Sequence, residues 1–167
     1  MNMQNRLLTI FTALTVAIAM GACAQKKTTP ETTPDSSNPS PADVSSDLAD
    51  SDSGKAMGLE TVHYAYDSSA LDKGAKATLN ANAQILKDKS NLKIQIEGHT
   101  DERGGIQYNI ALGERRANAA KAFLVDKGVG ADRVTTISYG KEKPTDQGHD
   151  ESAWSKNRRA NFRITEK

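Results

Sequence analysis

The sequence predicts an α/β (α+β) two-layer sandwich in which helices cover one face of a roughly four-stranded mixed sheet. Segments with strand-like alternation are interleaved with two long amphipathic segments, which gives a βαβαβ core. Two successive strand–helix–strand units favour parallel pairing with right-handed crossovers. Helices that cover a single face of such a sheet form two layers around one core.

Each element of this fold has its own signal. Residues 61–66 alternate as a strand, and residues 71–89 place their apolar side chains in one helical arc. Residues 92–96 alternate again, with Lys93, Gln95 and Glu97 on an expected wet face. The remaining elements are expected to be a loop over 98–105, a helix over 107–127 and strands over 134–139 and 161–165.

A different composition precedes this region. Residues 26–56 hold four of the five prolines, and residues 28–54 contain six acids but no Lys or Arg. Such a stretch cannot bury enough apolar surface to offset the entropy lost on ordering. We therefore expect a disordered tether over 23–56 and a compact domain over 57–167.

The first residues have the order of a secretory signal. Arg6 supplies positive charge, residues 7–20 are almost wholly apolar, and the small residues Gly21 and Ala22 precede Cys23. The apolar run is too short for an ordinary transmembrane helix, which needs about 20 residues. Residues 1–22 are thus expected to be a signal peptide. Cys23 is the only cysteine, so no intramolecular disulfide can form.

Charge excludes one class of partner. From Lys55 to Lys167 there are 19 basic and 15 acidic residues, a balance of +4. Nucleic-acid binding would require a basic face or stripe, which this modest excess does not indicate.

One charged residue interrupts the apolar arc of the second predicted helix. Arg116 falls between Leu112 and Phe123 at helical spacing, and a guanidinium on a buried face is costly unless an anion meets it. Asp101 stands in the loop at the exit of the preceding strand, where parallel α/β units bind ligands. Together they could hold the carboxylate and ammonium of one amino-acid end group. Alternatively, Arg116 snorkels or pairs with an internal carboxylate.

The acidic and histidine side chains near Asp101 also allow two other kinds of site. Glu97, His99 and Asp101 alternate and could face one way, but no further ligand cluster supports a metal site. Glu97 with Asp101 could also form the carboxylate pair of a glycan hydrolase. The chain has no Gly-x-Ser-x-Gly elbow or phosphate-binding glycine loop. We therefore expect neither a metal site nor an enzyme.

Several motifs resemble those of the OmpA C-terminal family, and more narrowly its peptidoglycan-associated lipoprotein branch. They cover nearly all of residues 61–164 and comprise 98–104, 108–118, 138–144, 148–151 and 155–160. Cys23 after the apolar run resembles a lipobox, with Met20 in place of the usual Leu. Ala24, rather than Asp, follows Cys23, which in such lipoproteins implies sorting to the outer membrane.

The resemblance implies an OmpA-like fold, an acyl (palmitate) anchor on Cys23 with no other cofactor, and a location at the periplasmic face of a Gram-negative outer membrane. It implies non-covalent binding of peptidoglycan at meso-diaminopimelate, with the family's Asp and Arg falling on Asp101 and Arg116. Its further binding residues fall on Tyr66, Asp67, Thr100, Asn109, Leu112 and Arg158.

The family also implies TolB and TolA as partners, within a Tol–Pal system that supports envelope integrity and cell division. Glu102, Arg103 and Tyr108 are the residues expected at that protein contact. The alternative is an OmpA-like peptidoglycan-binding lipoprotein outside the Tol–Pal system.

Overall fold

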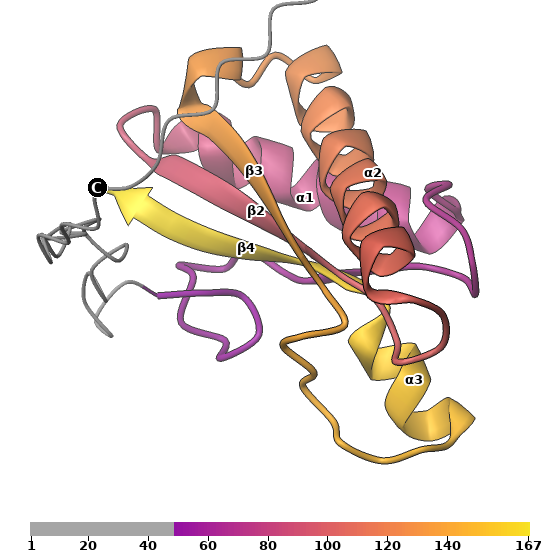
Figure 1. Cartoon of the computed structure of the whole chain (residues 1–167). Coiled ribbons are helices and arrows are strands. Elements are labelled where there is room, and N and C mark those ends of the chain that lie inside the picture. Colours follow the sequence, from indigo (N-terminus) through magenta and orange to yellow (C-terminus); the bar gives the residue numbers. More distant parts are fainter. Residues whose placement is uncertain (1–48) are drawn as a thin grey trace, which may run out of the picture. The chain divides into compact units, whose positions relative to one another are not determined.

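The computed structural model describes residues 49–167, which fold around one sheet and two long helices (Figure 1). The strands are β1 (Val62–His63), β2 (Lys93–His99), β3 (Val134–Gly140) and β4 (Arg159–Glu166). The helices are α1 (Lys73–Asp88), α2 (Ile106–Asp126), a 3-10 turn (Ala131–Arg133) and α3 (Glu151–Asn157).

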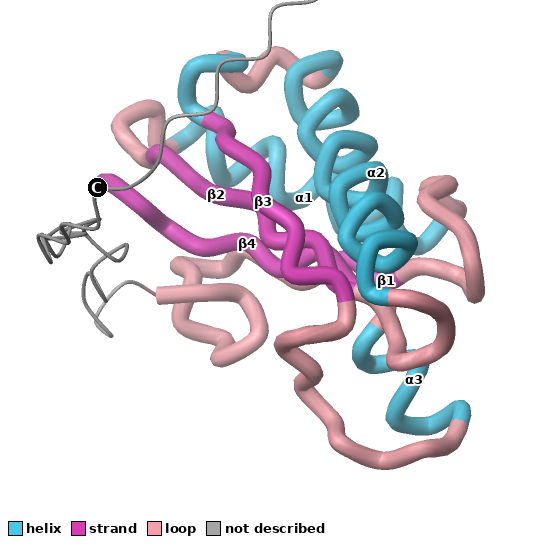
Figure 2. The backbone as a smooth tube through the Cα atoms, viewed as in Figure 1, coloured by secondary structure: helices cyan, strands magenta, loops and turns pink. Residues whose placement is uncertain are grey.

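The sheet has the strand order β1-β4-β2-β3. β2 and β3 are parallel neighbours joined through α2, whereas β4 runs antiparallel to both β1 and β2. β4 therefore lies between the two strands that α1 connects, which makes the sheet mixed (Figure 2). The predicted fold class, a four-stranded mixed sheet with helices on one face, is confirmed.

Apolar residues of both long helices and of the central strands form one core. α1 begins where the Asp72 carboxylate accepts a hydrogen bond from the Ala75 N–H at 2.7 Å, an N-cap that satisfies an otherwise unpaired donor. The largest fully buried apolar side chains are Phe162, Leu79, Leu86, Leu92, Ile94, Ile96, Leu124 and Ile164. Because α1 and α2 both contribute to this cluster, a single core fixes the two helices against the sheet.

Two glycines allow α2 to approach β2 closely. A Cβ added to Gly98 on β2 would lie 1.9 Å from the carbonyl oxygen of Gly113 on α2. A Cβ added to Gly113 would lie 2.3 Å from the Ser138 hydroxyl on β3. Only residues without side chains permit this backbone contact, and it sets the height of α2 over the sheet.

Two sequence expectations are wrong in detail, and two short helices were not expected from the sequence. The first strand spans only Val62–His63, because the chain beyond it turns away to form a loop around Arg116. Glu97 is not on a wet face: it is 7% exposed and accepts a hydrogen bond from Asn161 at 3.0 Å. α3 and the 3-10 turn were not predicted, since such short helices show little periodicity.

Residues 49–56, here called the N-terminal strap, correct the predicted domain boundary. The strap lies along β4, where the Ser51 N–H bonds the Phe162 carbonyl at 2.9 Å and the Ile164 N–H bonds the Ala49 carbonyl at 3.0 Å. Asp52 pairs with Arg159 at 2.7 Å, and Ala56 is fully buried in the core. The folded part of the chain therefore includes these residues, which the sequence assigned to the disordered tether.

The predicted signal peptide, Cys23 and most of the predicted tether fall within residues 1–48, outside the described part of the chain. Within residues 49–167, no helix combines the length and apolar character needed to cross a membrane.

Candidate functional site

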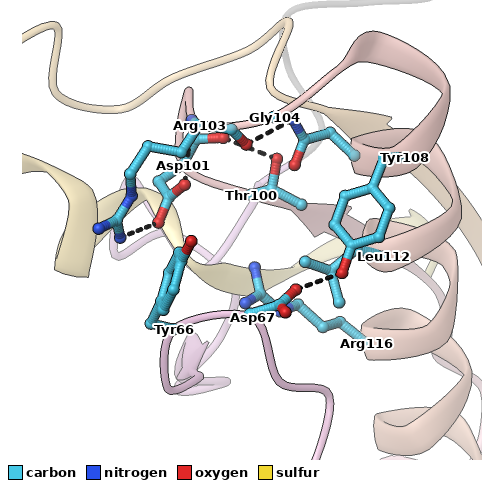
Figure 3. Close-up of a pocket in the computed structure, with 10 residues that line it drawn as sticks. Tyr66, Asp67, Thr100, Asp101, Arg103, Gly104, Tyr108, Leu112 and Arg116 are labelled. Carbon is cyan, nitrogen blue, oxygen red and sulfur yellow. Dashed lines mark hydrogen bonds and ion pairs between the residues drawn. The ribbon is translucent and has the colours of Figure 1, made fainter.

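A pocket of about 250 Å³ opens where β1 and β2 end and α2 begins (Figure 3). The loop after β1 supplies Tyr66 and Asp67, and the loop after β2 supplies Thr100, Asp101, Arg103 and Gly104. The first turns of α2 complete the wall with Tyr108, Asn109, Leu112 and Arg116. The carboxyl ends of strands meeting a helix N-terminus form the usual ligand position in α/β folds.

Arg116 forms the floor of the pocket and is fully buried. Its Nε, Nη1 and Nη2 atoms donate to the carbonyls of Ser68, His99 and Ala65 at 2.8, 2.8 and 3.1 Å. A guanidinium has five N–H donors, so two remain beyond these three bonds. Within residues 49–167 no carboxylate lies within salt-bridge distance of Arg116.

The surroundings of Arg116 tune its charge without neutralising it. Burial lowers the pKa of Arg116 to about 10, which still leaves the guanidinium charged at neutral pH. The Tyr64 ring lies 5.2 Å from the guanidinium carbon, and the Tyr64 hydroxyl donates to the Arg116 carbonyl at 2.8 Å. Burial also raises the pKa of Tyr64, which keeps the phenol neutral. The pocket therefore has a positive floor backed by an aromatic ring.

Asp101 provides the negative side of the pocket. Its Oδ2 atom lies 2.6 Å from Arg103 Nη2 and 3.4 Å from Arg158 Nη1, and its Oδ1 accepts from the Arg103 N–H at 3.2 Å. Burial raises the pKa of Asp101, but the hydrogen bonds from Arg103 outweigh it and hold that pKa below its usual value. Asp101 is therefore ionised at neutral pH and already paired.

Arg103 closes the rim of the pocket. Its guanidinium carbon lies 4.0 Å from the ring centroids of both Tyr66 and Trp154, so it is stacked between two aromatic rings. The indole N–H of Trp154 in turn donates to Glu102 at 2.9 Å. On the opposite rim the Tyr108 hydroxyl donates to Asp67 (Figure 3).

Hydrogen bonds hold the loop after β2 in place. The Thr100 N–H donates to the Gly140 carbonyl at 2.9 Å, and the buried Asn109 side chain donates to the Arg103 carbonyl at 2.9 Å. Lys141 reaches the carbonyls of Glu102 and Gly104 at 3.3 and 2.9 Å. These contacts explain why a loop that contains two consecutive glycines still presents Asp101 in one orientation.

The structure brings most of the predicted binding residues together. Those that line the pocket are Tyr66, Asp67, Thr100, Asp101, Asn109, Leu112 and Arg116. Arg158 does not line it but supports Asp101 from behind, and its Nη2 bonds Glu151 at 2.6 Å.

Glu102, Arg103 and Tyr108, the residues expected at a protein contact, do not all lie in one place. Arg103 and Tyr108 line the pocket, whereas Glu102 turns toward His149 and Trp154. The sequence analysis did not select Trp154 as a site residue. It is the only tryptophan of the chain and lies between two of the family motifs, 148–151 and 155–160.

The metal site and the pair of hydrolase carboxylates that the sequence allowed are not formed among the described residues. Glu97 bonds Asn161, while His99 stacks on Tyr139 with ring centroids 5.6 Å apart, and Asp101 faces the pocket. Across the described residues no group of three or more His, Cys, Asp or Glu side chains could hold a metal ion.

Chemically, the pocket combines a buried cation with donors to spare and a carboxylate across from it. Such a pair suits a ligand that carries a carboxylate and an ammonium close together.

The fold and this site define a class, the OmpA-like domain. A family model described as "OmpA family" matches residues 63–158, and the chain belongs to that family.

Its relatives include peptidoglycan-associated lipoproteins. The protein of that name from Pasteurella multocida is 50% identical over 100 residues, which cover 60% of this chain and 67% of that protein. The one from Agrobacterium fabrum is 40% identical over 156 residues and covers 89% of this chain and 82% of its own length.

Solved structures agree with this family. The crystal structure of the peptidoglycan-associated lipoprotein from Burkholderia pseudomallei is 42% identical, with a TM-score of 0.61, over 63% of this chain and 89% of that chain. The C-terminal domain of Helicobacter pylori MotB has the same TM-score of 0.61 at 20% identity, covering 66% of this chain and 87% of that chain. The second likeness concerns the fold alone.

Proposed function

We propose that this protein is an outer-membrane lipoprotein whose domain binds peptidoglycan non-covalently, at the meso-diaminopimelate end of the stem peptide. The observation that carries the proposal is the pairing of two side chains in one pocket, the buried Arg116 with unused donors and Asp101 across from it. The free end of diaminopimelate carries one carboxylate and one ammonium on the same carbon. Relatives named peptidoglycan-associated lipoproteins, at 40–50% identity, support peptidoglycan as the polymer that the domain binds.

In this proposal the site binds and does not catalyse. Glu97 and Asp101 are engaged by Asn161 and by Arg103, so neither carboxylate is arranged as a free acid–base partner of the other. Arg116 is anchored to three backbone carbonyls, which suits fixed recognition of an anion.

The wider role follows from the two ends of the chain. An acyl group on Cys23 would hold the N-terminus in the outer membrane, and the pocket would hold the cell wall. A non-covalent contact can break and form again while the wall grows or constricts. We further propose that TolB and TolA are partners, which would place the protein in a Tol–Pal system.

The test is co-sedimentation of residues 49–167 with purified sacculi that contain meso-diaminopimelate. We expect the wild type to pellet, and Asp101→Asn and Arg116→Lys to bind at least about tenfold more weakly, because each disturbs a desolvated charged contact. Lys is chosen at 116 because it retains the charge but lacks the planar fork. Met would leave buried carbonyls unpaired, at about 1–3 kcal/mol for each.

Matched controls lie at the other end of α2. Asp126→Asn removes the same charge as Asp101→Asn, and Lys127→Arg, like Arg116→Lys, exchanges one cation for another; both change exposed side chains and should bind like the wild type. Equal binding by all five proteins, each with a native melting temperature, would refute the proposed site. Soluble fragments released from the sacculi would instead support a hydrolase.

The Tol–Pal assignment needs a separate experiment. A TolB pull-down with the same domain should capture TolB from the same organism. Failure of that capture, under conditions in which the domain still pellets with sacculi, would favour an OmpA-like lipoprotein outside the system.

A further inference from the structure

Arg103 pairs with the carboxylate that the proposed function assigns to the ligand ammonium. Its Nη2 atom lies 2.6 Å from Asp101 Oδ2, and its backbone N–H bonds the other carboxylate oxygen at 3.2 Å. With Arg103 in place, the Asp101 side chain is only 6% exposed. Figure 3 shows the guanidinium beside Asp101 at the pocket rim. A cationic group from solvent that pairs with Asp101 therefore has to compete with the Arg103 side chain.

The contacts that hold Arg103 are ones that a side chain can leave. Two aromatic rings flank the guanidinium, but Tyr66 is 60% exposed and Arg103 itself is 31% exposed. Its second carboxylate, Glu151, is 3.8 Å away and 64% exposed. Its Nε atom is buried without a hydrogen-bond partner among the described residues. The Arg103–Glu151 ion pair is exposed, and exposed ion pairs of this kind contribute little to stability.

We propose that Arg103 is an internal latch: it occupies Asp101 in the free protein, and the ammonium of the ligand displaces it. This inference rests on the proposed function and adds how the same site is regulated. Arg116 is already free to accept the carboxylate of the ligand, so the latch adds a requirement for the ammonium. A plain dicarboxylate can bind Arg116 but cannot replace the positive charge at Asp101.

Displacement of Arg103 would also change the surroundings of Trp154. Trp154 on α3 stacks on the Arg103 guanidinium and donates to Glu102 at 2.9 Å. When Arg103 leaves Asp101, one face of the indole loses its cation. Trp154 is the only tryptophan in the chain, so a change in tryptophan emission can be assigned to this position beside Arg103.

The experiment titrates residues 49–167 with meso-diaminopimelate and with pimelate, which has the same carbon chain and no amino groups. Binding is followed by calorimetry and, independently, by Trp154 emission. We expect diaminopimelate to change the emission of the wild type, and pimelate to leave it unchanged. Arg103→Met should bind diaminopimelate roughly two- to fivefold more tightly, because no internal cation competes, and should show no ligand-dependent change in emission.

Arg103→Lys provides a second variant. It retains a charge but stacks less well between the two rings, so its affinity should lie between those of the wild type and Arg103→Met. Weaker binding by Arg103→Met, with native melting, would overturn the latch and make Arg103 a direct ligand contact. Binding by the wild type without any change in Trp154 emission would also overturn it. If the wild type binds neither diaminopimelate nor sacculi, the proposed function itself fails.

Discussion

His99 shows how a single residue links the two faces of the sheet. Its backbone carbonyl accepts a hydrogen bond from Arg116 at 2.8 Å on the pocket side. Its imidazole lies on the opposite side of the strand, 1% exposed and stacked on Tyr139. Neither ring nitrogen has a hydrogen-bond partner within residues 49–167. The Glu97 carboxylate lies 3.9 Å from His99 Nε2, beyond hydrogen-bond distance, so burial has the larger effect and favours the neutral imidazole.

This environment predicts a loss of stability in mild acid. Burial lowers the pKa of His99, and Arg159 acts in the same direction, although Glu97 and Asp52 oppose them. Because the folded-state pKa lies below the unfolded value, the unfolded chain takes up the proton first. The contribution of His99 to the free energy of unfolding is therefore complete above about pH 6.5. It decreases as the pH falls from there toward the folded-state pKa, by at most about 1.4 kcal/mol per pH unit.

Urea unfolding at pH 7 and pH 5 tests this prediction with His99→Phe as the comparison. Phe keeps the stack on Tyr139 and removes the titrating group without leaving a hydrogen-bond partner unpaired. His63 also has a pKa lowered by burial and acts in both proteins, so only the difference between them belongs to His99. If His99→Phe loses as much stability as the wild type between the two pH values, His99 does not cause the acid sensitivity.

At the scale of elements, the contact between β2 and α2 controls the pocket. Arg116 stands on α2 and Asp101 follows β2, so any shift of the helix relative to the strand changes their separation. We predict that Gly98→Ala lowers the free energy of unfolding by about 1–3 kcal/mol or more, because its Cβ would meet the Gly113 carbonyl. It should also weaken sacculus binding at temperatures where the variant remains folded.

Gly105→Ala is the matched control for this prediction. Gly105 precedes α2 with φ of −76°, and a Cβ there would meet nothing within 4 Å. Chemical denaturation and co-sedimentation of both variants separate a general effect of Ala from the specific contact. Equal stability of Gly98→Ala and the wild type would mean that the helix can move without cost, contrary to our account.

The elements also show what the sequence could and could not predict. Helical phase alone placed Arg116 on the buried face of α2, since a long amphipathic helix repeats its signal several times. Its three carbonyl partners could not be predicted, because they come from residues 17 to 51 positions away that only the tertiary fold brings near. The pairing of Arg103 with Asp101, two positions apart, depends likewise on the loop conformation.

The strap also shows what the sequence could not predict, because a segment expected to be disordered is folded. Its acidic and hydroxyl side chains predicted disorder, because that composition cannot form a core by itself. Asp52 instead meets Arg159, 107 positions later, and Ser51 meets Asn161, 110 positions later. A polar segment folds here because β4 presents buried polar side chains to it, and local composition carries no information about such a partner.

For the domain as a whole, the strap covers part of the outer edge of β4. β1 pairs with β4 only at Ala160 and Arg159, and the strap continues along the same edge through Phe162 and Ile164. Unpaired strand edges promote association with other chains, so covering this one protects the domain.

Removal of the strap should therefore affect stability and association before it affects binding. A variant that begins at residue 57 loses two backbone hydrogen bonds to β4, the Asp52–Arg159 ion pair and the buried Ala56. After allowance for the entropy that the free strap regains, we expect its free energy of unfolding to fall by on the order of 1–3 kcal/mol. We also expect concentration-dependent association through the exposed edge, measured by sedimentation velocity.

Sacculus binding by the same variant separates the strap from the pocket. No strap residue lines the pocket, so binding at a temperature where the variant is folded should match that of residues 49–167. Asp52→Asn, which keeps the strap but weakens its ion pair with Arg159, should lose only part of the stability and should associate no more than residues 49–167 do. If the truncated variant is as stable and as monomeric as the longer one, the strap is a passive part of the tether and the boundary at residue 57 is functionally adequate.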